Sequence, residues 1–174
     1  MARPRVRSLR DGTSVVVRAV RPSDRALIES GFRQLSLRSR IDRFLVPLSE
    51  LEDVRLAFLQ ELDGTAQAAV GAVTLDGRGV GIARYVRMPG EPRAAEIGIT
   101  VLDDYQGHGA GSLLFRELAA VAIGRGIRRF VGVVRAANER ALAPLRRIAS
   151  LVPDGPDLIR FEVDLVRLVE TGAG

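Results

Sequence analysis

The chain has 174 residues, which is enough for one domain with a substantial core and too few for two. Hydrophobic residues make up 47% and charged residues 27%, a composition that excludes a disordered or fibrous protein. There is no cysteine and only one histidine, His108, so disulfides, thiol nucleophiles and multi-histidine metal centres are excluded. We therefore expect no metal site.

The net charge of +5 suits an acidic ligand, but acidic residues are spread along the chain and the charge does not by itself indicate a nucleic-acid partner. All 26 basic residues are arginine. No apolar run is long enough to span a bilayer, and the first residues lead into no apolar signal-peptide core. These features predict a cytoplasmic protein without a membrane partner.

The chain begins with an arginine-rich stretch, which predicts a flexible arm over residues 1–11 followed by a single domain over 12–170. A first strand is expected at 15–20, and Ser23 or Asp24 can cap the helix that follows. A second helix is expected at 36–44. Ser49 and Glu52 form a capping box that predicts a third helix ending at Leu62.

The second half alternates strands and helices. The turn at 76–79 predicts a hairpin between strands 68–75 and 80–86, and Pro and Gly predict a loop at 88–93. Further strands are expected at 95–102, 130–135 and 158–166, with helices at 109–124 and 138–148 between them. This order predicts an α/β fold with a mixed sheet and one right-handed parallel crossover.

The crossover contains a glycine-rich stretch between an apolar strand and a helix. Glycines at a helix start let a ligand approach the backbone, whose first N–H groups have no intrahelical partner, so the stretch predicts a phosphate site. It is neither the dinucleotide fingerprint nor a Walker loop, since the chain has no lysine. The residues concerned are Gln106, Gly107, His108, Gly109, Ala110, Gly111 and Ser112.

The pattern Gln106-x-x-Gly109-x-Gly111 resembles the acyl-CoA pyrophosphate loop of the GNAT acyltransferase superfamily. The order of elements matches the GNAT fold, a mixed and mostly antiparallel sheet with one parallel βαβ crossover and helices on both faces. The stretches Leu9–Gly12, Arg18–Asp24, Ser39–Phe44 and Ala83–Val86 look like the acetyltransferase domain of Pat-type bacterial protein lysine acetyltransferases. The resemblance implies acetyl-CoA as co-substrate.

The resemblance also implies roles for individual residues. Glu96 matches the general base, with pairing to Arg84 or Arg93 as the structural alternative. The backbone of Ile99, Thr100 and Val101 would bind the pantetheine arm, as would Asn138, which could equally be a plain helix cap. Gly98 and Gly132 would open the gap that admits the cofactor, although packing explains them as well. Leu145 stands where the proton-donating tyrosine is usual, and the candidates to replace it are Ser150, Tyr85, Tyr105 and His108.

The implied function is direct acetyl transfer from acetyl-CoA to a primary amine, foremost a protein lysine side chain. Two alternatives stay open, namely transfer to a small-molecule amine and a non-catalytic acyl-CoA-binding module. The expected partners are an acyl-CoA and an acceptor protein or small amine. The chain is expected to be a monomer or a homodimer.

Overall fold

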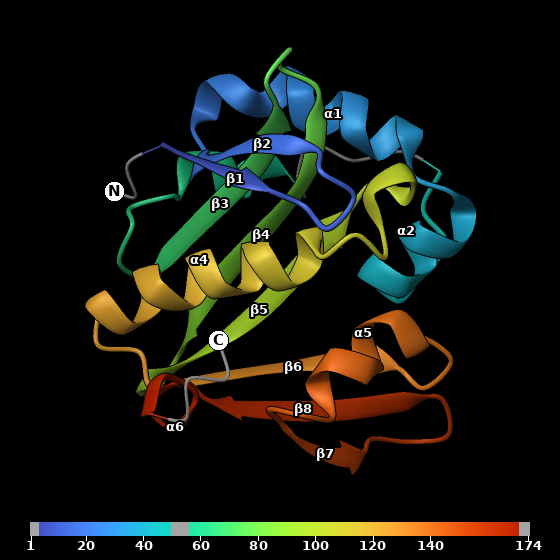
Figure 1. Ribbon diagram of the computed structural model, residues 1–174. Helices are drawn as coiled ribbons and strands as arrows, with labels where there is room; N and C mark the ends of the chain where they lie inside the picture. The colour runs from blue at the N-terminus through green and yellow to red at the C-terminus, as the bar shows by residue number, and fades with distance from the viewer. Residues whose placement is uncertain (1–3, 50–55, 171–174) are drawn as a thin grey trace.

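A single eight-stranded sheet forms the centre of the molecule (Figure 1). The structure, a computed structural model, describes residues 4–49 and 56–170. The strand order is β1-β2-β3-β4-β5-β6-β8-β7. The strands are β1 (Arg5–Ser8), β2 (Ser14–Ala19), β3 (Gln67–Thr74), β4 (Gly79–Met88), β5 (Glu91–Val101), β6 (Arg129–Arg135), β7 (Ser150–Pro153) and β8 (Leu158–Asp164).

One pair of neighbouring strands in the described sheet, β5 and β6, is parallel, and every other pair of neighbours is antiparallel. The crossover from β5 to β6 runs through helix α4 (Ala110–Gly124). The predicted mixed α/β sheet with one parallel crossover is therefore confirmed.

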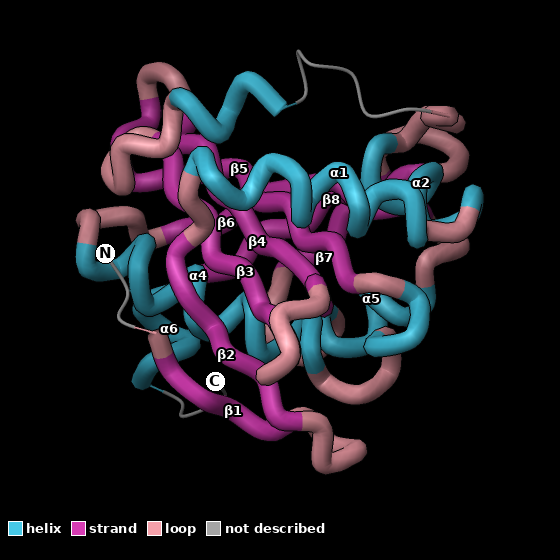
Figure 2. Tube along the Cα trace, turned by 90° about the horizontal axis from the view of Figure 1, so that it is seen from above, coloured by secondary structure: helices cyan, strands magenta, loops and turns pink. Residues whose placement is uncertain are grey.

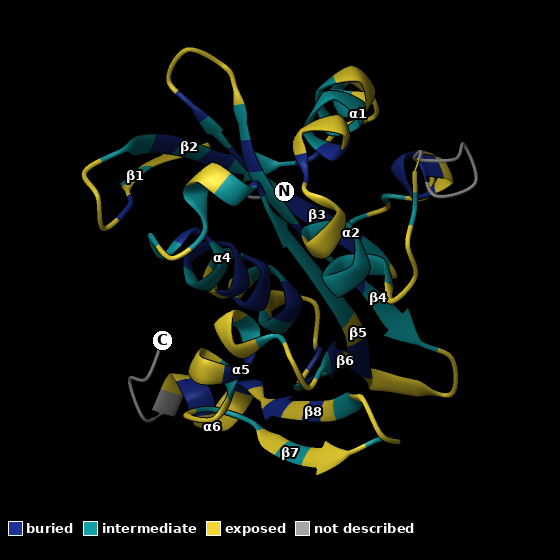
Figure 3. Ribbon diagram, turned by 90° about the vertical axis from the view of Figure 1, so that its right-hand side faces the viewer, coloured by how far each residue is buried: buried dark blue, intermediate teal, exposed yellow. Residues whose placement is uncertain are grey.

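Helices cover both faces of the sheet (Figures 2 and 3). On one face α4 packs with α5 (Glu139–Leu145) and α6 (Leu165–Glu170), whose buried leucines share one core with it. On the other face lie α1 (Arg25–Gln34) and α2 (Leu37–Phe44). Three short 3-10 turns complete the described chain: η1 (Pro22–Asp24), η2 (Ala57–Gln60) and η3 (Asp103–Tyr105).

Helix α4 contributes seven buried residues to the larger core. Its residues Leu114, Leu118 and Ala122 recur at helical spacing and are fully buried against the sheet. Phe115 of the same helix meets Phe130 of β6 edge-on, with 5.9 Å between the ring centroids. Because this helix is held along its whole length, its first turn is fixed in place at the end of β5.

The N-terminal stretch is not a free arm in its described part, which corrects the expectation for residues 1–11. Arg5–Ser8 form the edge strand β1, in register with β2. The guanidinium of Arg7 donates to Glu117 of α4 at 2.9 Å, and Leu9 is buried. The density of arginine predicts a solvated run, whereas the contacts of Arg5 and Arg7 with Glu117 of α4 hold β1 in the sheet.

Several predicted boundaries also shift. The expected loop at 88–93 is a two-residue turn, Pro89 and Gly90, because Gly90 adopts φ +78° and lets β5 begin at Glu91. The final strand ends at Asp164, whose carboxylate accepts from the N–H groups of Val166 and Arg167 and so starts α6.

The helix expected at 138–148 ends at Leu145, and the short edge strand β7 follows it. Neither β7 nor α6 was predicted. Residues 50–55 of the helix expected between Ser49 and Leu62 lie outside the described residues, and the rest includes the 3-10 turn η2.

Candidate active site

The two parallel strands separate after a short paired stretch. β5 and β6 pair only over three positions, from Ala94 with Arg129 to Glu96 with Val131. Beyond these positions β5 continues to Val101, while β6 turns to pair along its length with β8. Figure 1 shows the two strands diverging toward the end where α2 and α5 lie. The edge of β5 that faces β6 therefore has unpaired backbone groups.

The register with β4 decides which backbone groups these are. The N–H of Leu102 donates to the carbonyl of Val80, and antiparallel pairs alternate between bonded and non-bonded positions. The N–H and C=O of Thr100 therefore face β4, whereas those of Ile99 and Val101 face the gap. This corrects the expectation for the Thr100 backbone, whose side chain instead points to the α1/α2 face.

Packing explains the glycines of both strands. A Cβ atom on Gly98 would collide with the guanidinium of Arg43 from α2. One on Gly132 would lie 2.5 Å from the ring of Phe161, the residue opposite it in β8. Each glycine thus accommodates a larger side chain, and the separation of the strands does not depend on them alone.

The glycine-rich stretch forms a turn that leads directly into α4. Gly107 and Gly109 have φ of +83° and +90°, a conformation that favours glycine, and Gly109 is the helix N-cap. The first three N–H groups of α4 have no intrahelical partner. Among the described residues, the N–H groups of Gly107, His108 and Gly109 also donate no hydrogen bond. Six successive donors from Gly107 to Ser112 are therefore available to an anion.

Gln106 has a different place from the rest of that stretch. Its N–H donates to the carbonyl of Asp103, and its side-chain amide donates to Ser39 and to the carbonyl of Val101, both at 3.0 Å. It is therefore a support for the turn, and the expectation that Gln106 itself offers a donor to phosphate is wrong.

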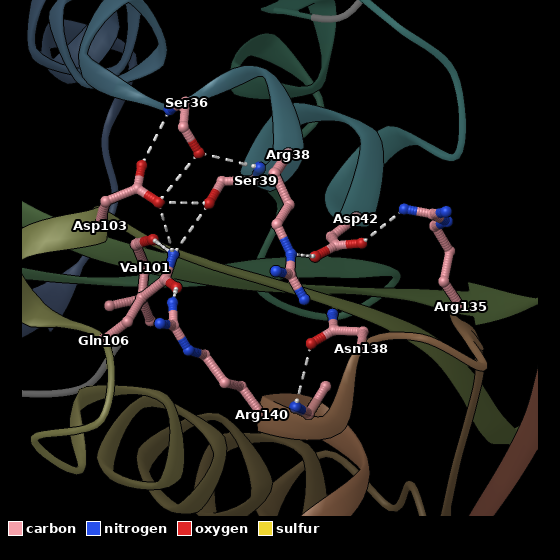
Figure 4. A network of polar contacts seen from close by, with 11 residues as sticks. Ser36, Arg38, Ser39, Asp42, Val101, Asp103, Gln106, Arg135, Asn138 and Arg140 are labelled. Atoms are coloured by element: carbon pink, nitrogen blue, oxygen red, sulfur yellow. Dashed lines mark hydrogen bonds and ion pairs between the residues drawn. The ribbon is translucent and has the colours of Figure 1, made fainter.

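Asp103 is the centre of the polar network that joins α2 to this turn (Figure 4). Its carboxylate accepts from the N–H of Ser36 at 2.8 Å and from the hydroxyl of Ser39 at 2.6 Å. Burial alone would raise the pKa of Asp103, but the hydrogen bonds from Ser39 and Ser36 outweigh it and lower the pKa. The network holds the start of α2 against the end of β5.

Two contacts link β6 and α5 on one side of the gap to α2 and Gln106 on the other. Arg135 at the end of β6 lies 3.1 Å from Asp42 of α2, and Arg140 of α5 donates to the side-chain oxygen of Gln106 (Figure 4). Asn138 begins α5, and its side-chain oxygen accepts from the N–H of Ala141 at 3.2 Å. The helix-cap alternative for Asn138 is thus realised, beside the mouth of the gap.

A cavity of about 530 Å³ opens on the α1/α2 face, directly over β4 and β5. Its walls are largely apolar, and Glu96, Gly98 and Thr100 of β5 lie along its floor. Glu96 is exposed, and within the described parts of the chain it forms no ion pair with Arg84 or Arg93. A carboxylate is therefore available at the point where β5 and β6 begin to separate. The apolar lining includes Leu27, Ile28, Phe32, Phe44, Phe58 and Ile82.

Arg43 and Arg84 also line this cavity, and the sequence singled out only Arg84, as a possible ion-pair partner of Glu96. Arg43 lies over Gly98, and Arg84 stacks on the ring of Phe58 at 4.5 Å. Burial lowers the pKa of Arg84, and the nearby carboxylates of Glu61 and Glu96 only partly offset it. Its Nε has no hydrogen-bond partner in the part of the chain that the structure describes. No sequence signal could have found this pair, because it depends on how α2 and η2 pack on the sheet.

The four candidates for a proton donor all lie outside the cavity. Tyr85 is fully buried in the core on the α4 face, and Ser150 lies on the edge strand β7. Tyr105 and His108 belong to the turns around the glycine-rich stretch, where His108 lies 3.8 Å from Asp11. None of these four candidate acids therefore lines the cavity that contains Glu96.

Neither a metal centre nor a membrane span is found in residues 4–49 and 56–170. No group of three or more potential ligands among Asp, Glu and His gathers there, and none of the helices has the length and hydropathy needed to cross a bilayer.

Comparisons with known proteins agree with this geometry. The sequence model of the Acetyltransferase (GNAT) family matches residues 34–147. The chain is 38% identical to the acetyltransferase PA5475 of Pseudomonas aeruginosa over 143 residues, which are 80% of this chain and 76% of that protein.

Solved structures show the same fold. The GNAT domain of S. lividans PAT superposes with a TM-score of 0.85 at 28% identity, covering 92% of this chain and 96% of that one. YncA of Salmonella typhimurium, solved with its cofactor acetyl-CoA, shares the fold alone, with a TM-score of 0.70 at 17% identity over 87% of this chain and 94% of that one. Because the family match covers more than half of its length, the chain belongs to the GNAT family of acetyltransferases, which are acyltransferase enzymes.

Proposed function

We propose that this acetyltransferase transfers the acetyl group of acetyl-CoA to lysine side chains of another protein, with Glu96 as general base. The observation that carries the proposal is the position of Glu96, an exposed carboxylate on the floor of an apolar cavity where β5 and β6 separate. The similarity to the GNAT domain of S. lividans PAT supports a protein acceptor.

The residues present fit acetyl-CoA. The six donors from Gly107 to Ser112 would hold its diphosphate at the start of α4. The backbone groups of Ile99 and Val101 would bind the pantetheine arm as an added strand, although the carbonyl of Val101 already accepts from Gln106. Asn138 would contact the same arm from the mouth of the gap. Acetyl-CoA supplies the acetyl group as an activated thioester.

Glu96 would accept a proton from the incoming ammonium, directly or through a water molecule, so that a neutral amine can attack the thioester carbon. A β5 N–H that faces the gap would donate to the carbonyl oxygen as negative charge develops on it. The new C–N bond then forms as the C–S bond breaks. Since no candidate acid lines the cavity, the thiolate would take its proton from water at the open gap.

The cavity walls favour a lysine side chain as the acceptor. Its unbranched apolar stem suits a passage formed by side chains such as Leu27, Phe32 and Phe44. The chain itself contains no lysine side chain to acetylate, so the acceptor must come from another molecule.

A second candidate acceptor is a small amine that carries an acidic group. A half-buried guanidinium with an unpartnered Nε is costly, and a ligand carboxylate at Arg84 would satisfy it. Arg84 lies on β4 diagonally across from Glu96, so an amino acid could reach both groups.

One assay separates the two acceptors. The protein is incubated with acetyl-CoA and, separately, with lysine peptides having acidic or basic flanks, free amino acids and polyamines, at low and high salt. We expect the fastest transfer to the acidic-flanked peptide, with the advantage fading in salt, because the chain carries a net positive charge. Transfer confined to free amino acids would reject the protein acceptor.

A further inference from the structure

The hairpin between β1 and β2 ends against the glycine-rich turn. The N–H of Arg10 donates to the carbonyl of His108 at 2.9 Å, and the carboxylate of Asp11 lies 3.8 Å from the His108 ring. Residues nearly a hundred positions apart are thus joined at the start of α4.

The side chain of Arg10 lies over the N-cap of α4. A Cβ atom built on Gly109 would be 3.5 Å from both Cγ and Nε of Arg10, which is ordinary van der Waals contact. The stem of Arg10 therefore packs on the surface of the turn that carries the six available N–H donors. The Nε of the Arg10 guanidinium lies beside this turn.

The hairpin holds this position firmly. Leu9 is buried, and its N–H donates to the carbonyl of Thr13 at 2.9 Å. Asp11 accepts from the N–H of Thr13 at 3.0 Å, and this bond lowers the pKa of Asp11. The carboxylate nearest to Arg10 in the sequence is thus used within the hairpin.

Arg10 differs from the other arginines of the hairpin. Arg5 and Arg7 both pair with Glu117, at 3.8 Å and 2.9 Å, and so fasten β1 to α4. In the described chain the guanidinium of Arg10 forms no ion pair or hydrogen bond, and the residue is exposed. An exposed guanidinium held over a row of N–H donors is placed to bind a phosphate oxygen.

We propose that Arg10 is a ligand of the acetyl-CoA diphosphate, delivered by the N-terminal hairpin to the turn at the start of α4. The inference rests on the proposed binding of acetyl-CoA at this turn. Arg10 adds a full positive charge to backbone donors that carry only partial charges. The arginine-rich N-terminus thus contributes to substrate binding through one residue, whereas its neighbours contribute to folding.

The test is the dissociation constant of CoA, measured by calorimetry for the wild type and for Arg10→Gln. Loss of one charge-assisted hydrogen bond predicts binding weaker by roughly tenfold. Arg10→Lys should recover part of it. Arg116→Gln removes the same charge from an exposed position further along α4 and serves as the matched control, with an unchanged constant.

Two further measurements distinguish a phosphate ligand from a structural residue. Arg10→Gln should weaken CoA and 3′-dephospho-CoA equally and leave acetyl transfer from acetyl-pantetheine, which has no phosphate, at the wild-type rate. If Arg10→Gln weakened the binding of CoA but not that of 3′-dephospho-CoA, the diphosphate assignment would be overturned. If it also slowed acetyl transfer from acetyl-pantetheine, the role of Arg10 would be structural. If the wild type binds no CoA, the proposed function itself fails; if the variant binds as tightly as the wild type, only the inference about Arg10 fails.

Discussion

The carboxylate of Asp103 should contribute measurably to the stability of the site, although its neighbour Asp104 should not. Asp103 accepts from Ser36 and Ser39 at 2.6–3.1 Å and from Gln106 at 3.4 Å, whereas Asp104 is exposed and accepts no hydrogen bond from another described residue. Replacing each in turn by alanine therefore compares the stability lost with a hydrogen-bonded carboxylate to the stability lost with an exposed carboxylate at the next position.

The size of the effect follows from the bonds lost. Hydrogen bonds to a charged acceptor are each worth about 1.5–3 kcal/mol, but several of these donors are exposed and can turn to water. We therefore expect Asp103→Ala to lower the free energy of unfolding by about 2 kcal/mol, which corresponds to a fall in Tm of about 4–8 °C for a domain of this size. Asp104→Ala should stay within about 0.5 kcal/mol of the wild type.

The effect should also depend on pH. Because the folded protein lowers the pKa of Asp103, its contribution is present above the pKa of the unfolded chain, about 3.9, and is lost as the pH falls through the folded value. The difference between wild type and Asp103→Ala in urea denaturation should be full at pH 7 and shrink below about pH 4. Equal stabilities of Asp103→Ala and Asp104→Ala at pH 7 would refute the reasoning.

Two more predictions concern glycines. Gly111→Glu should abolish the stabilisation that acetyl-CoA gives the wild type, because a carboxylate would repel the diphosphate. That stabilisation is about 2.7 kcal/mol at one hundred times the dissociation constant and is measured as a rise in Tm; Gly124→Glu, at the other end of α4, should keep it. Gly81→Ala should destabilise by about 1–3 kcal/mol in urea denaturation, since its Cβ would lie 2.6 Å from the carbonyl oxygen of Thr100 and 2.9 Å from Leu114, whereas Gly124→Ala meets nothing within 4 Å and should not destabilise. An unaltered Tm shift in the first case, or equal stabilities in the second, would count against the account.

The sequence predicted the elements that have local signals. The strands of the central sheet and helix α4 follow from hydrophobic periodicity. The helix expected at 36–44 is α2, and its first expected residue, Ser36, is the N-cap that accepts from the N–H of Ser39 at 3.2 Å. The same reasoning missed β7, a four-residue strand that follows helix α5, and α6, a short helix that begins where a strand pattern ends without a proline or glycine. It also misjudged β1, because arginines that look solvated are held by Glu117 of a distant helix.

The residues of the candidate site likewise divide into those that the sequence indicates and those that depend on tertiary packing. The glycine-rich turn is visible in the sequence because its glycines stand between an apolar strand and a helix, whereas Glu96 was singled out only through the family resemblance. The alternation that turns Thr100 away from the gap depends on the register with β4, which no local pattern gives. Arg10 and Arg43 come to the site only through tertiary packing, and in a chain with 26 arginines their residue type carries no signal. Arg84 was considered only as an ion-pair partner of Glu96, and its place in the cavity was not predicted.

The most direct test of the account is the rate of acetyl transfer by Glu96→Gln to the preferred acceptor, across pH. If Glu96 is the general base, kcat should fall roughly 10²–10⁴-fold at neutral pH, with an unchanged dissociation constant for acetyl-CoA, and recover in part toward pH 10 as free amine accumulates. Glu29→Gln on α1, which removes a carboxylate paired with Arg25 outside the cavity, should act as the wild type does. Wild-type turnover by Glu96→Gln at neutral pH would contradict the proposed mechanism.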